Sequence, residues 1–364
     1  MRRTLSFLAL ALVPLVATAA DKPSTRLDPQ LEKAAKAAVD KGIAFLQKQQ
    51  SDNGSYSHHV GLTSMALIAY ATSYHHYEEE SGSFVGLALN WLTAQQRPDG
   101  SISGETTPTY NTALAILAIN DLTKTGYRKF VTAGQKYLAT GVRDEGEGVE
   151  KSDKYFGGMG YDHKGRSDLS NLHFGLEALR DTDYDPDSEI WAKAQLFVSR
   201  CQNRSESNDQ PWAGDDGGFT YRPGGSSSGN TDSYGAMTFA GLKSLMFTRA
   251  KKDDPRVKAA WSWIQKHYGF NDHPGHGTTA YYYYLETAAS ALHAYGERYV
   301  VDARGRKHDW AADLAARLVS LQKPDGSWVN DNVEYWEGNK LLVTARAVIA
   351  LNHALAAAST PEKK

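Results

Sequence analysis

The segment FLQKQQSDNGSY, residues 45–56, decides the fold because two further segments of the chain repeat its spacing. These are WLTAQQRPDGSI at residues 91–102 and LVSLQKPDGSW at residues 318–328. Each places a glutamine four residues before a glycine, and a large side chain two residues after that glycine. Three weaker copies lie between them: one around residues 137–159, one around residues 197–219, and one that begins at Trp263. Six copies in one chain indicate a repeat architecture.

Each repeat contains two helix patterns, one on either side of the glycine turn. The segment before the glutamine is amphipathic, and the glycine ends that helix. The segment after the turn is richly apolar and follows a capping residue, at residues 62–70, 112–122, 172–179, 236–247, 281–292 and 341–351. We therefore predict an all-α fold, an (α/α)6 toroid of about twelve helices with the second helices inside. An open solenoid would need distinct end caps, which the sequence does not show.

Composition excludes several classes of protein. Lys and Arg total 40 against 42 Asp and Glu, so no basic surplus indicates a nucleic-acid partner. A hydrophobic share of 41% and a net charge of −2 exclude a disordered chain. The 364 residues alone would suggest two domains, but the repeats predict a single domain over residues 21–357.

The two ends of the chain are expected to lie outside that domain. Arg2 and Arg3 precede a short apolar stretch and small residues, a pattern typical of a signal peptide at residues 1–20. Residues 358–364 are polar and are expected to form a disordered tail. No later stretch is expected to span a membrane. The sequence therefore predicts an exported protein, periplasmic or extracellular, without a transmembrane anchor after signal cleavage.

The first repeat resembles the QW repeat of squalene and oxidosqualene cyclases, with tyrosine in place of tryptophan, at Lys41, Gly42, Phe45, Leu46, Gln50, Gly54 and Tyr56. The last repeat matches the second half of that motif at Gln322, Gly326 and Trp328. Protein prenyltransferase β subunits share the same toroid. The resemblance implies a barrel of the terpene cyclase/prenyltransferase kind in a single-barrel, exported bacterial form. It also implies an aromatic central cavity that binds an isoprenoid-like or other extended ligand.

The acid motif of these cyclases is not intact in this chain. Such enzymes protonate an alkene or epoxide with the middle acid of an Asp-x-Asp-Asp motif. The best match is Asp168-Leu169-Ser170-Asn171, in which Ser170 stands at the acid's place. The corresponding residues of the fourth repeat, 231–234, also lack the middle acid. The zinc ligands of the prenyltransferases are not recoverable, and no metal or cofactor is expected.

Four carboxylates are candidates for catalysis: Asp168, Asp215, Asp216 and Asp232. Asp168 is equally suited to capping a helix. Asp215 and Asp216 precede paired glycines and are equally suited to a turn. If the acid has been relocated, Asp216 or Asp232 is the expected replacement.

Eight further residues are candidates for ligand binding: Asn171, His173, Tyr221, Tyr234, His276, Tyr281, Tyr284 and Trp336. The four consecutive tyrosines at residues 281–284 point in different directions on a helix, and only Tyr281 and Tyr284 share a face. One or two of the four rings are expected to face the cavity, where they suit a carbocation, a flat sugar or a lipid.

Three classes of function follow. The first is a non-catalytic toroid that binds an isoprenoid, peptide or glycan. The second is a terpene cyclase-like or prenyltransferase-like enzyme with a relocated acid. The third is a carbohydrate-active enzyme, because glycosidases also use (α/α)6 barrels with paired carboxylates. The missing middle acid favours the first class.

Overall fold

The computed structural model describes residues 27–104, 106–123 and 126–359. The predicted signal peptide at residues 1–20 and the last five residues of the predicted tail lie outside these ranges. The outer helices are α1 (Pro29–Lys48), α3 (Ser83–Thr93), α5 (Arg128–Ala139), α7 (Ile190–Arg200), α9 (Pro255–Lys266) and α11 (Trp310–Leu321). The inner helices are α2 (Val60–Ala71), α4 (Pro108–Leu122), α6 (Leu169–Asp181), α8 (Gly235–Phe247), α10 (Tyr281–Tyr295) and α12 (Lys340–Ser359).

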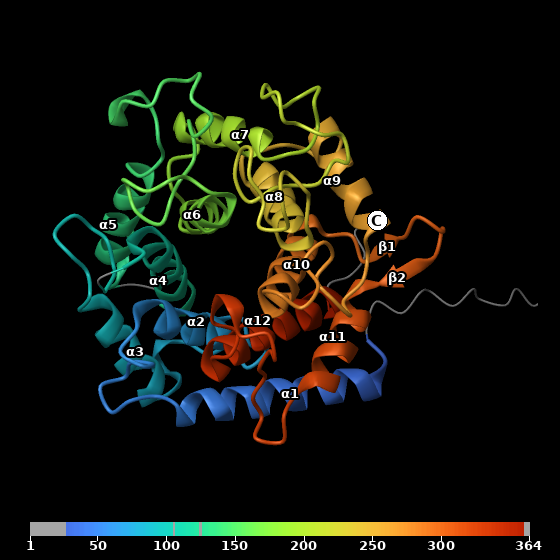
Figure 1. The fold of residues 1–364 in the computed structure, drawn as a ribbon. Helices are drawn as coiled ribbons and strands as arrows, with labels where there is room; N and C mark the ends of the chain where they lie inside the picture. The colour runs from blue at the N-terminus through green and yellow to red at the C-terminus, as the bar shows by residue number, and fades with distance from the viewer. Residues whose placement is uncertain (1–26, 105, 124–125, 360–364) are drawn as a thin grey trace, which may run out of the picture.

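The inner helices form a closed ring with the outer helices around it (Figure 1). Each inner helix packs against the inner helix before and after it, and α12 packs against α2 to close the ring. The prediction of an all-α toroid with the second helix of each pair inside is therefore confirmed. Because the first and last repeats pack against each other, no repeat has an exposed end face, and no end caps are needed.

Inner and outer helices differ in how much of their surface they bury. Of the thirteen residues of α8, only Met246 is not buried. The outer helix α5 buries one stripe, which includes Val131 and Leu138, and exposes the rest. A helix that is apolar on all sides belongs in the interior, and an amphipathic helix belongs at the surface. The apolar second segments therefore form the inner ring.

The repeated glutamines join neighbouring outer helices. Each side-chain amide donates to the carbonyl of the glycine in its own turn and to a carbonyl of the following outer helix. The distances from Nε2 to the second carbonyl oxygen are 2.7 Å for Gln50 to Phe84, 2.9 Å for Gln96 to Phe130, 2.9 Å for Gln202 to Arg256 and 2.8 Å for Gln322 to Ala38. The last of these bonds joins α11 to α1.

The glycines of these turns approach the next outer helix so closely that a side chain would not fit. Gly100 has a φ of +91°, and an added Cβ would lie 2.4 Å from the Ala133 carbonyl oxygen. We expect Gly100→Ala to lower the free energy of unfolding by about 2 kcal/mol, from backbone strain and this contact. Gly296→Ala is the control, since Gly296 also has positive φ but an added Cβ meets nothing within 4 Å. Equal losses in urea denaturation would contradict the role of the contact.

Three features differ from the sequence prediction. A short antiparallel hairpin, β1 (Tyr299–Val301) and β2 (Lys307–Asp309), joins α10 to α11. Helix α12 continues to Ser359, two residues beyond the predicted end of the domain. Among the described helices, α12 alone is long and apolar enough to cross a membrane, but it is a mostly buried helix of the inner ring. Its apolar surface is therefore covered by protein.

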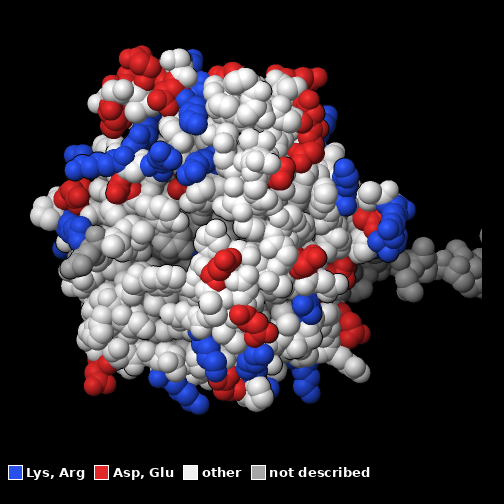
Figure 2. Space-filling view, in the orientation of Figure 1, with Lys and Arg blue, Asp and Glu red and all other residues white. Residues whose placement is uncertain are grey.

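Long loops precede two of the inner helices and shape one end of the toroid. Residues 140–168 lie between α5 and α6 and contain the 3-10 helix η2 (Glu145–Glu147), and residues 201–234 lie between α7 and α8. Two further 3-10 helices are η1 (Glu79–Ser81) and η3 (Glu334–Trp336). The face shown in Figure 2 is hollowed near its middle, where few charged side chains lie.

Candidate functional site

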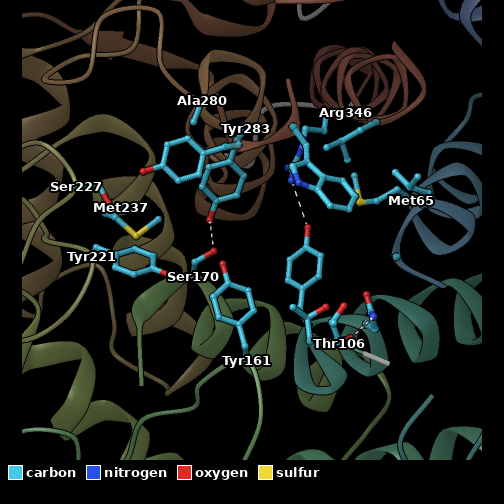
Figure 3. A pocket seen from close by; sticks show the side chains of 18 of the residues that line it. Met65, Thr106, Tyr161, Ser170, Tyr221, Ser227, Met237, Ala280, Tyr283 and Arg346 are labelled. Atoms are coloured by element: carbon cyan, nitrogen blue, oxygen red, sulfur yellow. Dashed lines mark hydrogen bonds between the residues drawn. The ribbon is translucent and has the colours of Figure 1, made fainter. Parts of the chain in front are cut away.

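A cavity of about 480 Å³ lies where the inner helices begin. Every inner helix contributes to its wall, through Met65, Tyr110, Ser170, Met237, Tyr283 and Arg346. The loops before these helices add further rings: His59, Tyr161, Tyr221, Tyr234, His273, His276, Tyr335 and Trp336. The cavity therefore has a largely aromatic and aliphatic wall with hydroxyl groups distributed over it (Figure 3).

The N-terminus of α6 brings a buried carboxyl behind this wall. Asp168 is 3% exposed and caps the helix, accepting hydrogen bonds from the backbone N–H of Asn171 at 2.8 Å and from its side-chain amide at 2.8 Å. Burial raises the pKa of Asp168 to about 6, although hydrogen bonds from Asn171 and Tyr221 lower it. Asp168 does not itself line the cavity, but its neighbour Tyr221 does.

Four hydroxyl groups gather in front of Asp168, and we call them the hydroxyl cluster: Tyr161, Ser170, Tyr221 and Tyr283. The Ser170 hydroxyl lies 2.9 Å from the Tyr283 hydroxyl, which joins α6 to α10. Tyr161 and Tyr221 come from the two long loops, and both line the cavity. In Figure 3 these side chains point toward one part of the cavity, around Ser170.

Arg346 forms the charged part of the opposite wall. It is the only Lys, Arg, Asp or Glu among the described residues that line the cavity. Its guanidinium donates to the carboxylate of Glu286, lies 3.3 Å from the Tyr110 hydroxyl, and sits 4.8 Å from the centre of the Tyr283 ring. Arg346 and Glu286 are each 7% exposed. The cation is therefore neutralised by a partner from the adjacent inner helix α10.

Two histidines line the cavity beside α8. The Nδ1 of His273 lies 2.8 Å from the Thr279 carbonyl oxygen, while its Nε2 accepts from the Ala236 backbone N–H at 2.9 Å. These partners require a neutral ring with the proton on Nδ1, and burial lowers the pKa of His273 to about 3. Burial also lowers the pKa of His276, whose ring meets Tyr234 edge-on at 4.8 Å. Both rings therefore add uncharged surface to the cavity.

The segment after the last glycine turn is fixed to α10 by Glu337. This buried carboxylate accepts from backbone N–H groups at the start of α10, at 2.8 Å for Tyr283, and from the Asn330 amide at 2.7 Å. The contact places the neighbouring rings of Tyr335 and Trp336 at the cavity, where they remain 61% and 59% exposed. The Trp336 ring also meets His59 edge-on at 5.5 Å.

Backbone strain is concentrated at this cavity. Four of its residues have positive φ without being glycine: Thr107, Ala280, Tyr335 and Trp336, at 51°, 51°, 53° and 65°. Each such conformation costs of order 1–3 kcal/mol and is typical of ligand-binding and active sites. The concentration of strain at the entrance points to the cavity as the functional site.

None of the four predicted catalytic residues lines the cavity: Asp168 lies behind its wall, and the other three lie at the surface. Asp215, Asp216 and Asp232 are exposed. Asp215 accepts from Ser205, and Asp216 accepts from the Gly218 backbone N–H at 2.9 Å. The Asp216 contact is typical of Asp in turns, because its side chain bonds to the backbone two residues on, whereas Asp215 ties this turn to Ser205, ten residues earlier. Asp216 and Asp232 are therefore not placed to act as a relocated acid in this cavity.

The predicted ligand-binding residues divide into two groups. Tyr221, Tyr234, His276 and Trp336 line the cavity, whereas Asn171, His173, Tyr281 and Tyr284 do not. Tyr281 and Tyr284 are directed away from the cavity, and their hydroxyls donate to the carbonyl oxygens of Phe270 and Gly269. Asn171 is engaged with Asp168, and His173 is buried within the ring of helices.

Sequence reasoning missed Tyr283 and Arg346. Tyr283 was within the tyrosine run, but periodicity does not tell which face of a helix meets a cavity. A positive charge within the apolar segment 341–351 was a usable signal, because a buried Arg requires a partner and is often functional. Among the described residues, no group of three His, Cys, Asp or Glu side chains is placed to hold a metal ion.

Comparisons with known proteins identify the fold. No protein-family model and no curated protein matches the chain. The type II terpene cyclase MstE from Scytonema is similar in structure, with a TM-score of 0.55 and 15% sequence identity over 89% of this chain and 99% of that one. Its complex with the product merosterolic acid A gives the same TM-score at 14% identity. A glycosidase aligns over 91% of this chain and 99% of its own, with a TM-score of 0.51 and 12% identity. This chain therefore has a terpene cyclase-like toroid fold.

Proposed function

We propose that this protein binds an extended, largely apolar ligand of the isoprenoid type in the cavity and does not cyclise it. The observation that carries the proposal is the composition of the wall, which is aromatic and aliphatic and includes no Asp or Glu among its described residues. Such a wall favours burial of a hydrocarbon chain. The structure of MstE with geranylgeranyl dihydroxybenzoate, a substrate, supports a prenyl chain as ligand for this fold.

The place of Ser170 supports binding without cyclisation. In the cyclase motif that residues 168–171 resemble, the middle position carries the acid. Ser170 occupies that position, lines the cavity and bonds to Tyr283. Protonation of an alkene requires a strong acid in contact with it, and a serine hydroxyl is not one.

The alternative functions share the fold of the terpene cyclase and glycosidase neighbours, but the described cavity wall supplies no carboxyl group for either reaction. A relocated acid at Asp216 or Asp232 would lie outside the cavity. Glycoside hydrolysis requires two carboxyl groups that flank the scissile bond, and the described wall provides none. Action outside the cytoplasm remains part of the proposal, supported by the sequence of residues 1–20.

Ligand binding by the cavity can be tested by filling it. We expect Leu342→Trp to raise the Kd for squalene and for geranylgeraniol at least tenfold, because Leu342 lines the cavity and is only 8% exposed. Leu87→Trp is the matched control, since Leu87 is 43% exposed on the outer helix α3. Binding is measured by native mass spectrometry and by quenching of tryptophan fluorescence.

Two outcomes would contradict the proposal. Failure of the unmodified protein to bind any prenyl-chain compound would overturn the binding function. Cyclised products after incubation with squalene, oxidosqualene or geranylgeranyl diphosphate would overturn the absence of cyclisation.

A further inference from the structure

We propose that the ligand of this cavity carries a neutral hydroxyl head, as in an isoprenoid alcohol, and that the hydroxyl cluster binds that head. The inference rests on the proposed function and specifies its ligand class. It follows from two properties of the wall: where its hydrogen-bonding groups gather, and how its charge is balanced.

The hydroxyl cluster brings four of the wall's hydroxyl groups together at one place in the cavity. Its four side chains come from two inner helices, α6 and α10, and from the two long loops. The 2.9 Å hydrogen bond between the Ser170 and Tyr283 hydroxyls fixes one pair, and the side chains of Tyr161 and Tyr221 point toward the same place (Figure 3). Since each hydroxyl can donate one hydrogen bond and accept two, the cluster retains free acceptor sites after this bond is made.

Asp168 orients this cluster as a positioning residue. An ionised carboxylate accepts hydrogen bonds and donates none, so the Tyr221 hydroxyl beside it directs its proton toward Asp168. The Tyr221 oxygen then offers lone pairs, rather than its proton, to the cavity that it lines. A ligand that donates a hydrogen bond at this place is therefore favoured over one that only accepts.

The charge balance favours a neutral head. Arg346 is already paired with Glu286, and farther inside the ring Lys243 is paired with Glu177. A diphosphate or carboxylate head would find no unpaired cation on the described wall and would lie near the Glu286 carboxylate. A cationic head would find no carboxylate on that wall and would lie near Arg346. Burying an unpaired charge is costly in either case.

The inference is tested with three probes that share one prenyl chain: geranylgeraniol, its methyl ether and geranylgeranyl diphosphate. We expect the alcohol to bind about tenfold more tightly than the ether, from one additional hydrogen bond. We also expect the alcohol to bind more tightly than the diphosphate. Tyr221→Phe and Tyr161→Phe should abolish the preference for the alcohol by weakening its binding, with little change for the ether.

Tyr335→Phe is the matched control, because Tyr335 also lines the cavity but lies outside the hydroxyl cluster. It should leave the tenfold preference unchanged. Tyr161 is 46% exposed, so Tyr161→Phe is expected to fold. This variant therefore allows the test even if Tyr221→Phe does not fold.

The possible outcomes separate this inference from the proposed function. Equal binding of alcohol and ether, tighter binding of the diphosphate, or a preference that survives both Phe variants would overturn the neutral hydroxyl head and leave a prenyl-binding cavity. Failure of all three probes to bind would overturn the proposed function and this inference together.

Discussion

Arg346→Leu is expected to lower the free energy of unfolding by about 3–5 kcal/mol, because it leaves the carboxylate of Glu286 buried without its partner. Both side chains are almost completely buried, and they join the adjacent inner helices α10 and α12. The substitution also removes the contact with the Tyr110 hydroxyl and the cation–π contact with Tyr283. Urea denaturation at neutral pH, followed by circular dichroism, measures the loss.

A double variant separates the loss of the pair from the loss of packing. Arg346→Leu with Glu286→Leu is expected to recover most of the stability, because no buried charge is left uncompensated. Lys252→Met is the surface control, since Lys252 pairs with Glu297 at 2.6 Å and both side chains are about half exposed. That change should cost at most about 1 kcal/mol. If Arg346→Leu costs no more than Lys252→Met, the buried pair is not a determinant of stability.

The fold was predictable because its signals are local and repeated. In the first, second and last repeats, the glutamine, the glycine and the large side chain lie within seven residues, so their spacing is visible in the sequence. The structure shows why this spacing recurs: the Gln50 and Gln96 amides each bind their own turn and the following outer helix. A short segment of this kind therefore carries information about both the turn and the neighbouring repeat.

The composition of the cavity was less predictable because it depends on the direction of side chains in three dimensions. Helical periodicity correctly placed Tyr281 and Tyr284 on one face, but that face turns toward the carbonyl groups of Phe270 and Gly269. Tyr283 meets the cavity instead. No local pattern distinguishes these two possibilities, because both directions bury the rings.

Partners distant in sequence explain the other differences. Glu286 and Arg346 are 60 residues apart, and neither segment shows the pairing by itself. The acidic turn at Asp215 and Asp216 was assigned a catalytic role because carboxylates can supply protons. The bond of Asp216 to the Gly218 backbone is the ordinary turn chemistry of aspartate, the equal alternative in the sequence; Asp215 instead binds Ser205, ten residues earlier in the chain.

Asp168→Asn is expected to make the protein less sensitive to pH between about 4 and 6.5. Burial raises the pKa of the folded carboxyl from 3.8 to about 6, so the folded state holds a proton that the unfolded state has already released. Stability from this residue is therefore present below pH 3.8 and is lost as the pH rises through 6, by about 3 kcal/mol in total.

Asparagine cannot ionise, and its side-chain oxygen can still cap α6. Relative to the unmodified protein, the variant should thus gain about 2.4 kcal/mol between pH 4 and pH 7, measured by urea denaturation at both values. The exposed Asp232→Asn should show no such relative gain; an equal gain in both variants, or none in Asp168→Asn, would mean that burial of Asp168 is not what couples folding to pH.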